Sequence, residues 1–245
     1  MAKTKRSSPK GPNLKVLYGV LVLVAVLGGG WIAYSLTSGG TAATAPIELS
    51  GIEDPRALLD QARGVALGPE NGVQILVFSD FTCPACQGYT GFVEPQIKAE
   101  YVQSDQVRYV YYDFPIGGPG HEHGFVAARA ARCAGEQDKF WEYHDLLFAR
   151  QSEWSFARTA PVSQFLEYGD LLGLDRGSLS SCIRSDRFAD VVTANRLLGE
   201  RLGVGSTPTI FIGSRSVPDW RDYDNVKALI EQELATSKPA SESNQ

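Results

Sequence analysis

The sequence has no excess of positive charge, few cysteines and no internal repeat, and each absence excludes a class of protein. Its 23 Lys and Arg are outnumbered by 28 Asp and Glu. The net charge of −5 and the pI near 5.3 argue against a nucleic-acid-binding protein, which normally has a basic face. Four cysteines are too few for a small disulfide-stapled scaffold but enough for two pairs. The hydrophobic (43%) and charged (21%) fractions exclude wholesale disorder and fibrous repeats.

Charge is also missing from residues 16–36, which are mostly apolar. A helix of this length rises about 32 Å, enough to cross a hydrocarbon core of about 30 Å. Residues 1–15 hold five cations and no acid, and such a flank stays in the cytoplasm. We therefore expect a cytoplasmic tail at 1–15, a transmembrane anchor at 16–36, and an extracytoplasmic remainder in the cell membrane. A cleaved signal peptide is the alternative, because Ala43-Thr44-Ala45 resembles a cleavage site, although the apolar run exceeds the usual ~7–15 residues.

The rest of the chain divides into a polar linker, a globular body and a polar tail. Residues 37–46 are small and polar, which predicts a flexible linker. Residues 237–245 are also polar and are predicted to be a disordered tail. The body therefore spans 47–236. Whether the segment is kept as an anchor or cleaved as a signal peptide, we expect the body to be exported. Its cysteines would then lie in an oxidising compartment.

Hydrophobic patterning predicts an α/β body. Apolar, β-branched runs predict strands at 73–78, 107–112 and 207–212. Helices are predicted at 56–62 with Asp54 as cap, from the cysteine motif to about 101, at 161–172, 175–184, 188–202 and 222–234. Helical signals run almost unbroken from 121 to 202. The order of these elements predicts a sheet domain that carries a helical insertion at about 121–202.

Cys83-Pro84-Ala85-Cys86 lies where the 73–78 strand gives way to a helix. At a helix amino terminus, unpaired N–H groups and the helix dipole favour a thiolate over a thiol. A thiolate attacks disulfides, and a second cysteine three residues on can resolve the mixed disulfide. Pro84 suits the first helical turn. The position predicts Cys83 as the exposed nucleophile and Cys86 as the more buried resolving thiol.

Three other interpretations of this pair compete: a structural disulfide, half of a zinc site, and a copper-handling pair. Zinc would need a second close pair of Cys or His, whereas Cys133 and Cys182 stand 49 residues apart. A copper handler would add a nearby His or Met, and the only methionine is Met1. The junction of strand and helix favours redox chemistry, with no metal and no cofactor beyond the cysteines.

Four separated stretches share a pattern of residue types with one known family. They are Phe81–Cys86, Asp113-Phe114-Pro115 ahead of His121, Ala127–Ala134 leading into Lys139–Phe148, and Gly203–Thr209. Together they resemble the DsbA-like thiol:disulfide oxidoreductases over about 70–235. The resemblance implies a thioredoxin fold with an inserted helical domain, here preceded by one N-terminal transmembrane helix. It also implies unfolded or reduced exported proteins as substrates and re-oxidation by a membrane quinone-coupled partner.

The resemblance also assigns residues near Pro208. In thioredoxin folds a cis-proline lies beside the active-site sulfurs, and the preceding residue, here Thr207, contacts the substrate cysteine. Strongly oxidising members have histidine at the position of Ala85 and often valine at the position of Thr207. These departures leave a disulfide reductase or isomerase of the same fold as the alternative to an enzyme that introduces disulfides. A metal-binding or chaperone-like module is a further alternative.

The remaining polar side chains are assigned structural roles. Cys133 and Cys182 have no motif neighbours, and in an exported chain we expect a disulfide that joins two helices. Asp80 is expected to cap the helix after the motif, in preference to moving a proton to or from Cys86. The pair His121 and His123 is expected to be a solvated helix start rather than a metal site. His144 is expected to be a packing residue.

Overall fold

The structure is a computed structural model and describes residues 42–237. The basic tail, the predicted anchor at 16–36 and residues 238–245 lie outside the described residues. Within 42–237, no helix combines the length and the apolar character needed to cross a membrane.

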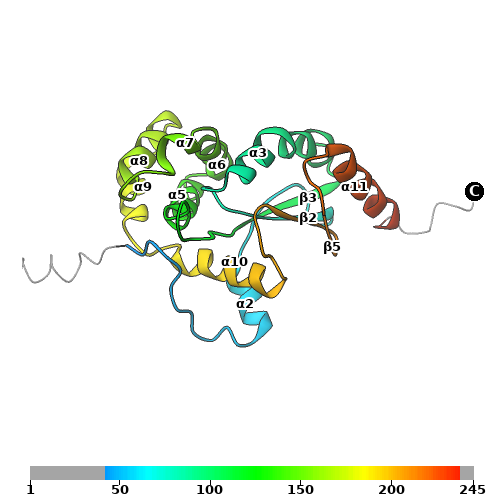
Figure 1. Cartoon of the computed structure of the whole chain (residues 1–245), viewed down its shortest axis with the longest axis horizontal. Coiled ribbons are helices and arrows are strands. Elements are labelled where there is room, and N and C mark those ends of the chain that lie inside the picture. Colours follow the sequence, from blue (N-terminus) through cyan, green and yellow to red (C-terminus); the bar gives the residue numbers. More distant parts are fainter. Residues whose placement is uncertain (1–41, 238–245) are drawn as a thin grey trace, which may run out of the picture. The chain divides into compact units, whose positions relative to one another are not determined.

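A five-stranded sheet lies at the centre of the described chain (Figure 1). Its strands are β1 (Val65–Leu67), β2 (Val73–Ser79), β3 (Val107–Asp113), β4 (Thr209–Ile212) and β5 (Arg215–Ser216). The order is β1-β3-β2-β4-β5, with β2 and β3 parallel and the other neighbours antiparallel. The apolar runs correctly predicted β2, β3 and β4. They missed β1 and β5, which are only three and two residues long.

Helices cover both faces of this sheet. They are α2 (Pro55–Gln61), α3 (Pro84–Phe92), α4 (Glu94–Ile97), the π-helical segment η1 (Lys98–Val102), α5 (Gly124–Gly135), α6 (Phe140–Ala149), α7 (Gln151–Trp154), α8 (Val162–Leu171), α9 (Arg176–Ile183), α10 (Ala189–Arg201) and α11 (Tyr223–Ser237). Figure 1 shows α3 and α11 on one side of the strands and α2 and α10 on the other. Successive strand side chains point to opposite faces, so β2 is buried on both.

The packing of β2 follows this alternation. Ile75 and Val77 pack in one cluster with Tyr89 of α3 and Ile230 of α11. Phe78 packs in a second cluster with side chains of α2 and α10. The cysteine motif follows the carboxyl end of this buried strand, and Cys86 is part of the core.

Helices α5 to α9 form a block at one end of the sheet (Figure 1). Their buried side chains form one core together with Cys86 and Tyr111. The last helix of the predicted insertion, α10, packs mainly on α2 and β3, and only Ala189 and Val192 near its start join the core of the block. The body is thus the thioredoxin-type α/β fold with a helical insertion that the sequence predicts, and the insertion proper ends before α10.

Local chain signals explain the helix boundaries. Asp54 caps α2 as predicted, because its carboxylate accepts the Arg56 N–H at 2.9 Å. The single helix expected from the motif to residue 101 is wrong, since α3 ends at Phe92 and α4 and η1 follow. Pro95 cannot donate a helical hydrogen bond and restricts the residue before it, so the helix is interrupted there.

The end of the predicted linker lies against the body. The Ala43 N–H donates to the Asp186 carboxylate at 2.6 Å, and the Ala43 carbonyl accepts from the Arg129 guanidinium. Ile47 donates to the Thr193 hydroxyl at 3.1 Å. Residues 42–46 were expected to be flexible, but the buried Arg129 side chain needs acceptors and finds one in this backbone.

Candidate active site

The cysteine motif begins α3. Cys83 is the N-cap residue with an extended backbone, and Pro84 occupies the first helical turn. Cys83 is 7% exposed and Cys86 is fully buried at 0%. Pro84 is exposed and Ala85 is half-buried between the two cysteines. Cys86 is therefore the more buried of the two, as predicted, but Cys83 is also buried and is not the exposed residue that was expected.

Hydrogen bonds stabilise the thiolate of Cys83. They lower its pKa to about 5, the largest contribution being the bond with the Cys86 side chain, followed by those with Thr207 and with the amides of Cys86 and Ala85. Burial opposes this shift. In the thiol form, Sγ of Cys83 donates to the carbonyl oxygen of Thr207 at 3.4 Å.

Cys86 has the opposite preference. Burial raises its pKa well above the usual value for a thiol, and the neighbouring Cys83 raises it further. A hydrogen bond with the Ser79 side chain, at the end of β2, acts in the other direction. Near neutral pH the pair therefore exists as one thiolate and one thiol when it is reduced.

The Thr207-Pro208 peptide bond is cis. It immediately precedes β4, and β4 pairs with β2 so that Phe78 lies opposite Thr209. This pairing brings Thr207 to the first sulfur, in the arrangement that the family resemblance implies for these two residues. The structure thus gathers Cys83, Cys86, Thr207 and Pro208 in one place.

Gln151 is a contributor that the sequence did not indicate. Its side-chain amide is buried and donates to the carbonyl oxygens of Phe81 at 2.8 Å and of Cys83 at 3.0 Å. It comes from α7, a four-residue helix, and holds the segment that leads into the motif. A lone glutamine 65 residues further along the chain than Cys86 gives no signal in the sequence.

Asp80 does not cap α3, contrary to expectation. Its Oδ1 accepts from the N–H of Thr82 at 2.8 Å and from the Thr82 hydroxyl at 2.6 Å. Its Oδ2 accepts from the Ile116 N–H at 2.9 Å and lies 3.2 Å from Nδ1 of His121. The Asp80 side chain is fully buried, so water cannot solvate its charge. These four contacts replace the solvation that a capping carboxylate at the surface would receive from water.

The histidines of the following loop are not a solvated helix start either. His121 pairs with Asp80, and His123 is 7% exposed with Nε2 at 2.7 Å from the Ala157 carbonyl oxygen. His144 is fully buried among aromatic rings, including Phe81 and Tyr111, as expected for a packing residue.

Cys133 of α5 and Cys182 of α9 form a disulfide, which is the pairing expected from the sequence. Cys83 and Cys86 are unbonded thiols in this structure. The disulfide joins two helices of the helical block, whereas Cys83 and Cys86 lie at the start of α3, just after the carboxyl end of the central strand β2.

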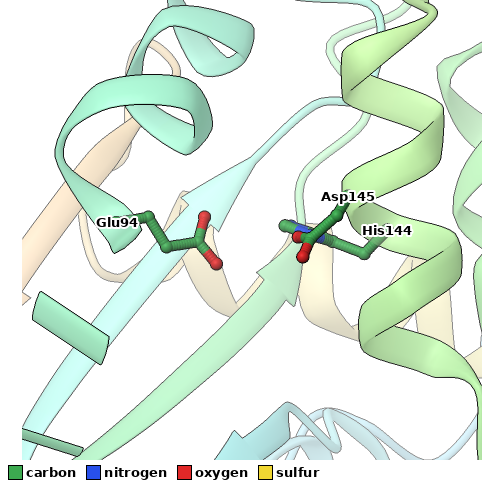
Figure 2. A group of neighbouring side chains, drawn as sticks. All are labelled: Glu94, His144 and Asp145. Atoms are coloured by element: carbon green, nitrogen blue, oxygen red, sulfur yellow. The ribbon is translucent and has the colours of Figure 1, made fainter. Parts of the chain in front are cut away.

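Three potential metal ligands, Glu94 of α4 and His144 and Asp145 of α6, lie close together. Figure 2 shows the Glu94 carboxylate facing His144 and Asp145, and their ligand atoms all lie within 4.8 Å of one another. The Lys98 ammonium lies 2.6 Å from Glu94 Oε1, 3.9 Å from Asp145 Oδ1 and 4.3 Å from the Trp141 ring centre. Lys98 thus already supplies the cation that these two carboxylates need.

Comparisons with known proteins agree with this site. The profile of a thioredoxin family matches residues 61–232. Disulfide bond formation protein D of Bacillus subtilis is 25% identical over 66% of this chain and 72% of its own length. The Na(+)/H(+) antiporter NhaA 3 of Salinispora tropica is 34% identical over 67% of this chain, but the match spans only 24% of the antiporter.

A solved structure shows the same fold. The crystal structure of oxidised BdbD from Bacillus subtilis superposes with a TM-score of 0.63 at 22% identity, covering 69% of this chain and 92% of BdbD. Residues 61–232, which the family profile matches, include β2, the cysteine motif, the helical insertion and the cis Thr207-Pro208 bond. The chain therefore belongs to the thioredoxin family and is a DsbA-like thiol:disulfide oxidoreductase.

Proposed function

We propose that this enzyme acts outside the cytoplasmic membrane and introduces disulfides into exported proteins through Cys83 and Cys86. The observation that carries the proposal is the contrast between the two sulfurs: the pKa of Cys83 is lowered to about 5, whereas that of Cys86 is raised. A disulfide is a strong oxidant when its reduced form is stabilised, and a stable thiolate has that effect.

The exchange proceeds in two steps. A thiolate of the reduced substrate attacks Sγ of Cys83, the Cys83–Cys86 bond breaks, and Cys86 leaves and takes up a proton. The second thiolate of the substrate then attacks the substrate sulfur of the mixed disulfide, and Cys83 leaves as a thiolate. A leaving thiol of low pKa leaves faster, so this second step favours release of oxidised substrate. Counted from its dithiol form, the substrate loses two electrons and two protons. The enzyme gains both electrons and one proton, which Cys86 carries, and the other proton goes to the solvent.

The residues around the sulfurs support this sequence of steps. The Thr207 carbonyl oxygen contacts Cys83 and is available to the backbone of a bound substrate once the mixed disulfide has formed. Pro208 holds that carbonyl beside the motif through the cis bond. Cys83 is 7% exposed, and the exposed Pro84 and the small Ala85 are its neighbours on the side from which a substrate would approach.

An extracytoplasmic location, with anchoring through residues 16–36, is part of the same proposal. Disulfides persist in oxidising compartments, and the Cys133–Cys182 bond in the helical block fits such a compartment. A membrane quinone-coupled partner would restore the Cys83–Cys86 disulfide, and no cofactor beyond the two cysteines is required. The name of the Bacillus subtilis relative, a disulfide bond formation protein, is consistent with this direction.

Transfer to a reduced protein tests the proposal. Oxidised full-length enzyme, mixed with an unfolded protein that carries two thiols, should lose its own disulfide as the substrate gains one. Cys86→Ser cannot form the enzyme disulfide, so it is mixed instead with a protein that carries a disulfide. The Cys83 thiolate should attack that disulfide, one substrate sulfur should leave as a thiolate, and the mixed disulfide should accumulate because the resolving thiol is gone. The matched variant Cys83→Ser should accumulate none. Mixed disulfides through Cys86, or oxidised enzyme that leaves the substrate thiols unchanged, would contradict the proposal.

A further inference from the structure

His121 bridges the loop before α5 and the segment that carries the first cysteine. Its Nδ1 lies 3.2 Å from Oδ2 of Asp80 and 2.8 Å from the hydroxyl oxygen of Thr82. Thr82 directly precedes Cys83, and the backbone carbonyl of Asp80 accepts the Cys83 N–H at 3.0 Å. The imidazole is thus held by the two residues that also fix the backbone of the nucleophile.

The hydrogen bonds determine which nitrogen of His121 titrates. The Thr82 hydroxyl donates its one hydrogen to Asp80, so it must accept from His121, and Nδ1 therefore carries a hydrogen. Nε2 is then the nitrogen that gains and loses the second proton. The neutral ring keeps both contacts of Nδ1. Titration consequently changes the charge beside the motif without removing the contacts that position the ring.

Three acidic groups act on His121: Asp80, which directly follows β2, Cys83 at the start of α3, and Glu122 on its own loop. Together they raise the pKa of His121, with the hydrogen bond to Asp80 contributing most, while burial acts against the shift. The residues between the two cysteines, Pro84 and Ala85, carry no charge.

We propose that the imidazolium of His121 stabilises the Cys83 thiolate of the reduced enzyme and thereby makes the Cys83–Cys86 disulfide more oxidising below the pH at which His121 loses its proton. The proposal rests on the proposed function of Cys83. Reduction takes two electrons and one proton, which goes to Cys86, while His121 keeps its own proton as the counter-charge. Both electrons come from the substrate dithiol. His121 is a positioning residue here, because it acts through Cys83 and not on the substrate.

The variant His121→Asn separates charge from structure. Asn Nδ2 is as many bonds from the backbone as Nδ1 of histidine, so it keeps the donor but cannot become a cation. We expect its disulfide to be about three- to tenfold harder to reduce with glutathione at pH 6 than that of the wild-type full-length protein, which is about 15–30 mV. The gap should close toward pH 9, and the thiolate absorbance of Cys83 should titrate at a higher pH in the variant.

His123→Gln is the matched control. His123 lies two residues further on and uses Nε2 to contact the Ala157 carbonyl oxygen, a position that the Gln amide nitrogen can take. This variant should keep the wild-type equilibrium constant at every pH. An offset in His121→Asn that is the same at pH 6 and pH 9 would overturn the proposal, because it would reflect structure and not charge.

A measurement on the wild-type protein does not depend on any variant. Coupling between two sites is reciprocal, so a thiolate that His121 stabilises must also stabilise the imidazolium. An NMR titration should find the pKa of His121 higher by about 0.5 to 1 in the reduced than in the oxidised protein, the same three- to tenfold factor. Equal values in the two redox states would overturn the proposal. Failure of the wild-type pair to exchange with glutathione would instead contradict the proposed function.

Discussion

At the scale of single residues, position in the first helical turn separates two otherwise identical side chains. Cys83 precedes the helix and receives hydrogen bonds from Cys86 and from the amides of the first turn, whereas Cys86 is enclosed by the core. The first arrangement favours the charged form and the second the neutral form. The motif alone predicts this contrast, since it follows from the place of a Cys-x-x-Cys sequence after a strand.

The first prediction concerns how pH affects the stability of the reduced protein. The folded state lowers the pKa of Cys83 to about 5, so its thiolate stabilises the folded reduced protein, and this stabilisation is lost as the pH falls through 5. The oxidised protein has no such thiolate. Between pH 5 and 8 the free energy of unfolding of the reduced form should rise relative to the oxidised form, by at most about 1.4 kcal/mol per pH unit. Thermal unfolding of both forms would measure this, and parallel pH profiles would contradict it.

The second prediction concerns Gly124, the first residue of α5. A Cβ at this position would lie 2.5 Å from Oδ1 of Asp80. Gly124→Ala should therefore displace the buried carboxylate and lower the free energy of unfolding by about 1–3 kcal/mol, measured by urea denaturation. Gly91→Ala is the control, because nothing lies within 4 Å of its Cβ position in α3. That variant should be neutral or more stable by up to about 1 kcal/mol, and equal effects of the two substitutions would contradict the packing argument.

At the scale of elements, patterning predicted most of the elements that bury a repeating face. Strand β2 and helices α8 to α10 were predicted close to their observed bounds. Strands β1 and β5 were missed because two or three residues are too few to show an alternating pattern. These strands form by pairing with β3 and β4. The same limit applies to the site. The cysteines were visible as a local motif, but the contacts of Asp80 with His121 and of Gln151 with Cys83 join segments far apart in the sequence.

The third prediction concerns the disulfide between α5 and α9. It closes a loop across 49 residues of sequence, which in the chain-entropy model contributes roughly 4 kcal/mol. In the double variant Cys133→Ala, Cys182→Ala, the free energy of unfolding should fall by about that amount. Amide hydrogens in α5 and α9 should exchange faster. The Cys83–Cys86 pair must be in the same redox state in both proteins. Unchanged stability and exchange would show that packing alone holds the two helices.

At the scale of the whole molecule, the chain combines a DsbA-like body with an amino-terminal segment that the structure does not describe. The sequence predicts that residues 16–36 anchor the body on the outer side of the membrane. Tethering would keep the active site close to newly exported chains and to a re-oxidising partner in the membrane. Both consequences follow from location and not from the geometry of the site.

The fourth prediction tests that location. Full-length protein should remain with the membrane fraction after alkaline carbonate extraction, and a variant that lacks residues 1–36 should be released. Protease added to cells whose cell wall or outer membrane has been removed, with the cytoplasmic membrane intact, should digest the body. A soluble form whose first residue is Pro46 would support the cleaved signal peptide instead, and protection of the body from protease would contradict export.

The reduction potential of the Cys83–Cys86 pair tests the central claim most directly. Full-length protein would be equilibrated with glutathione buffers of known potential and its free thiols trapped and counted. Because the Cys83 thiolate is stabilised, we predict a potential of about −120 to −180 mV, the range of proteins that donate disulfides. A value near about −270 mV, that of thioredoxin, would contradict the claim and indicate a reductase.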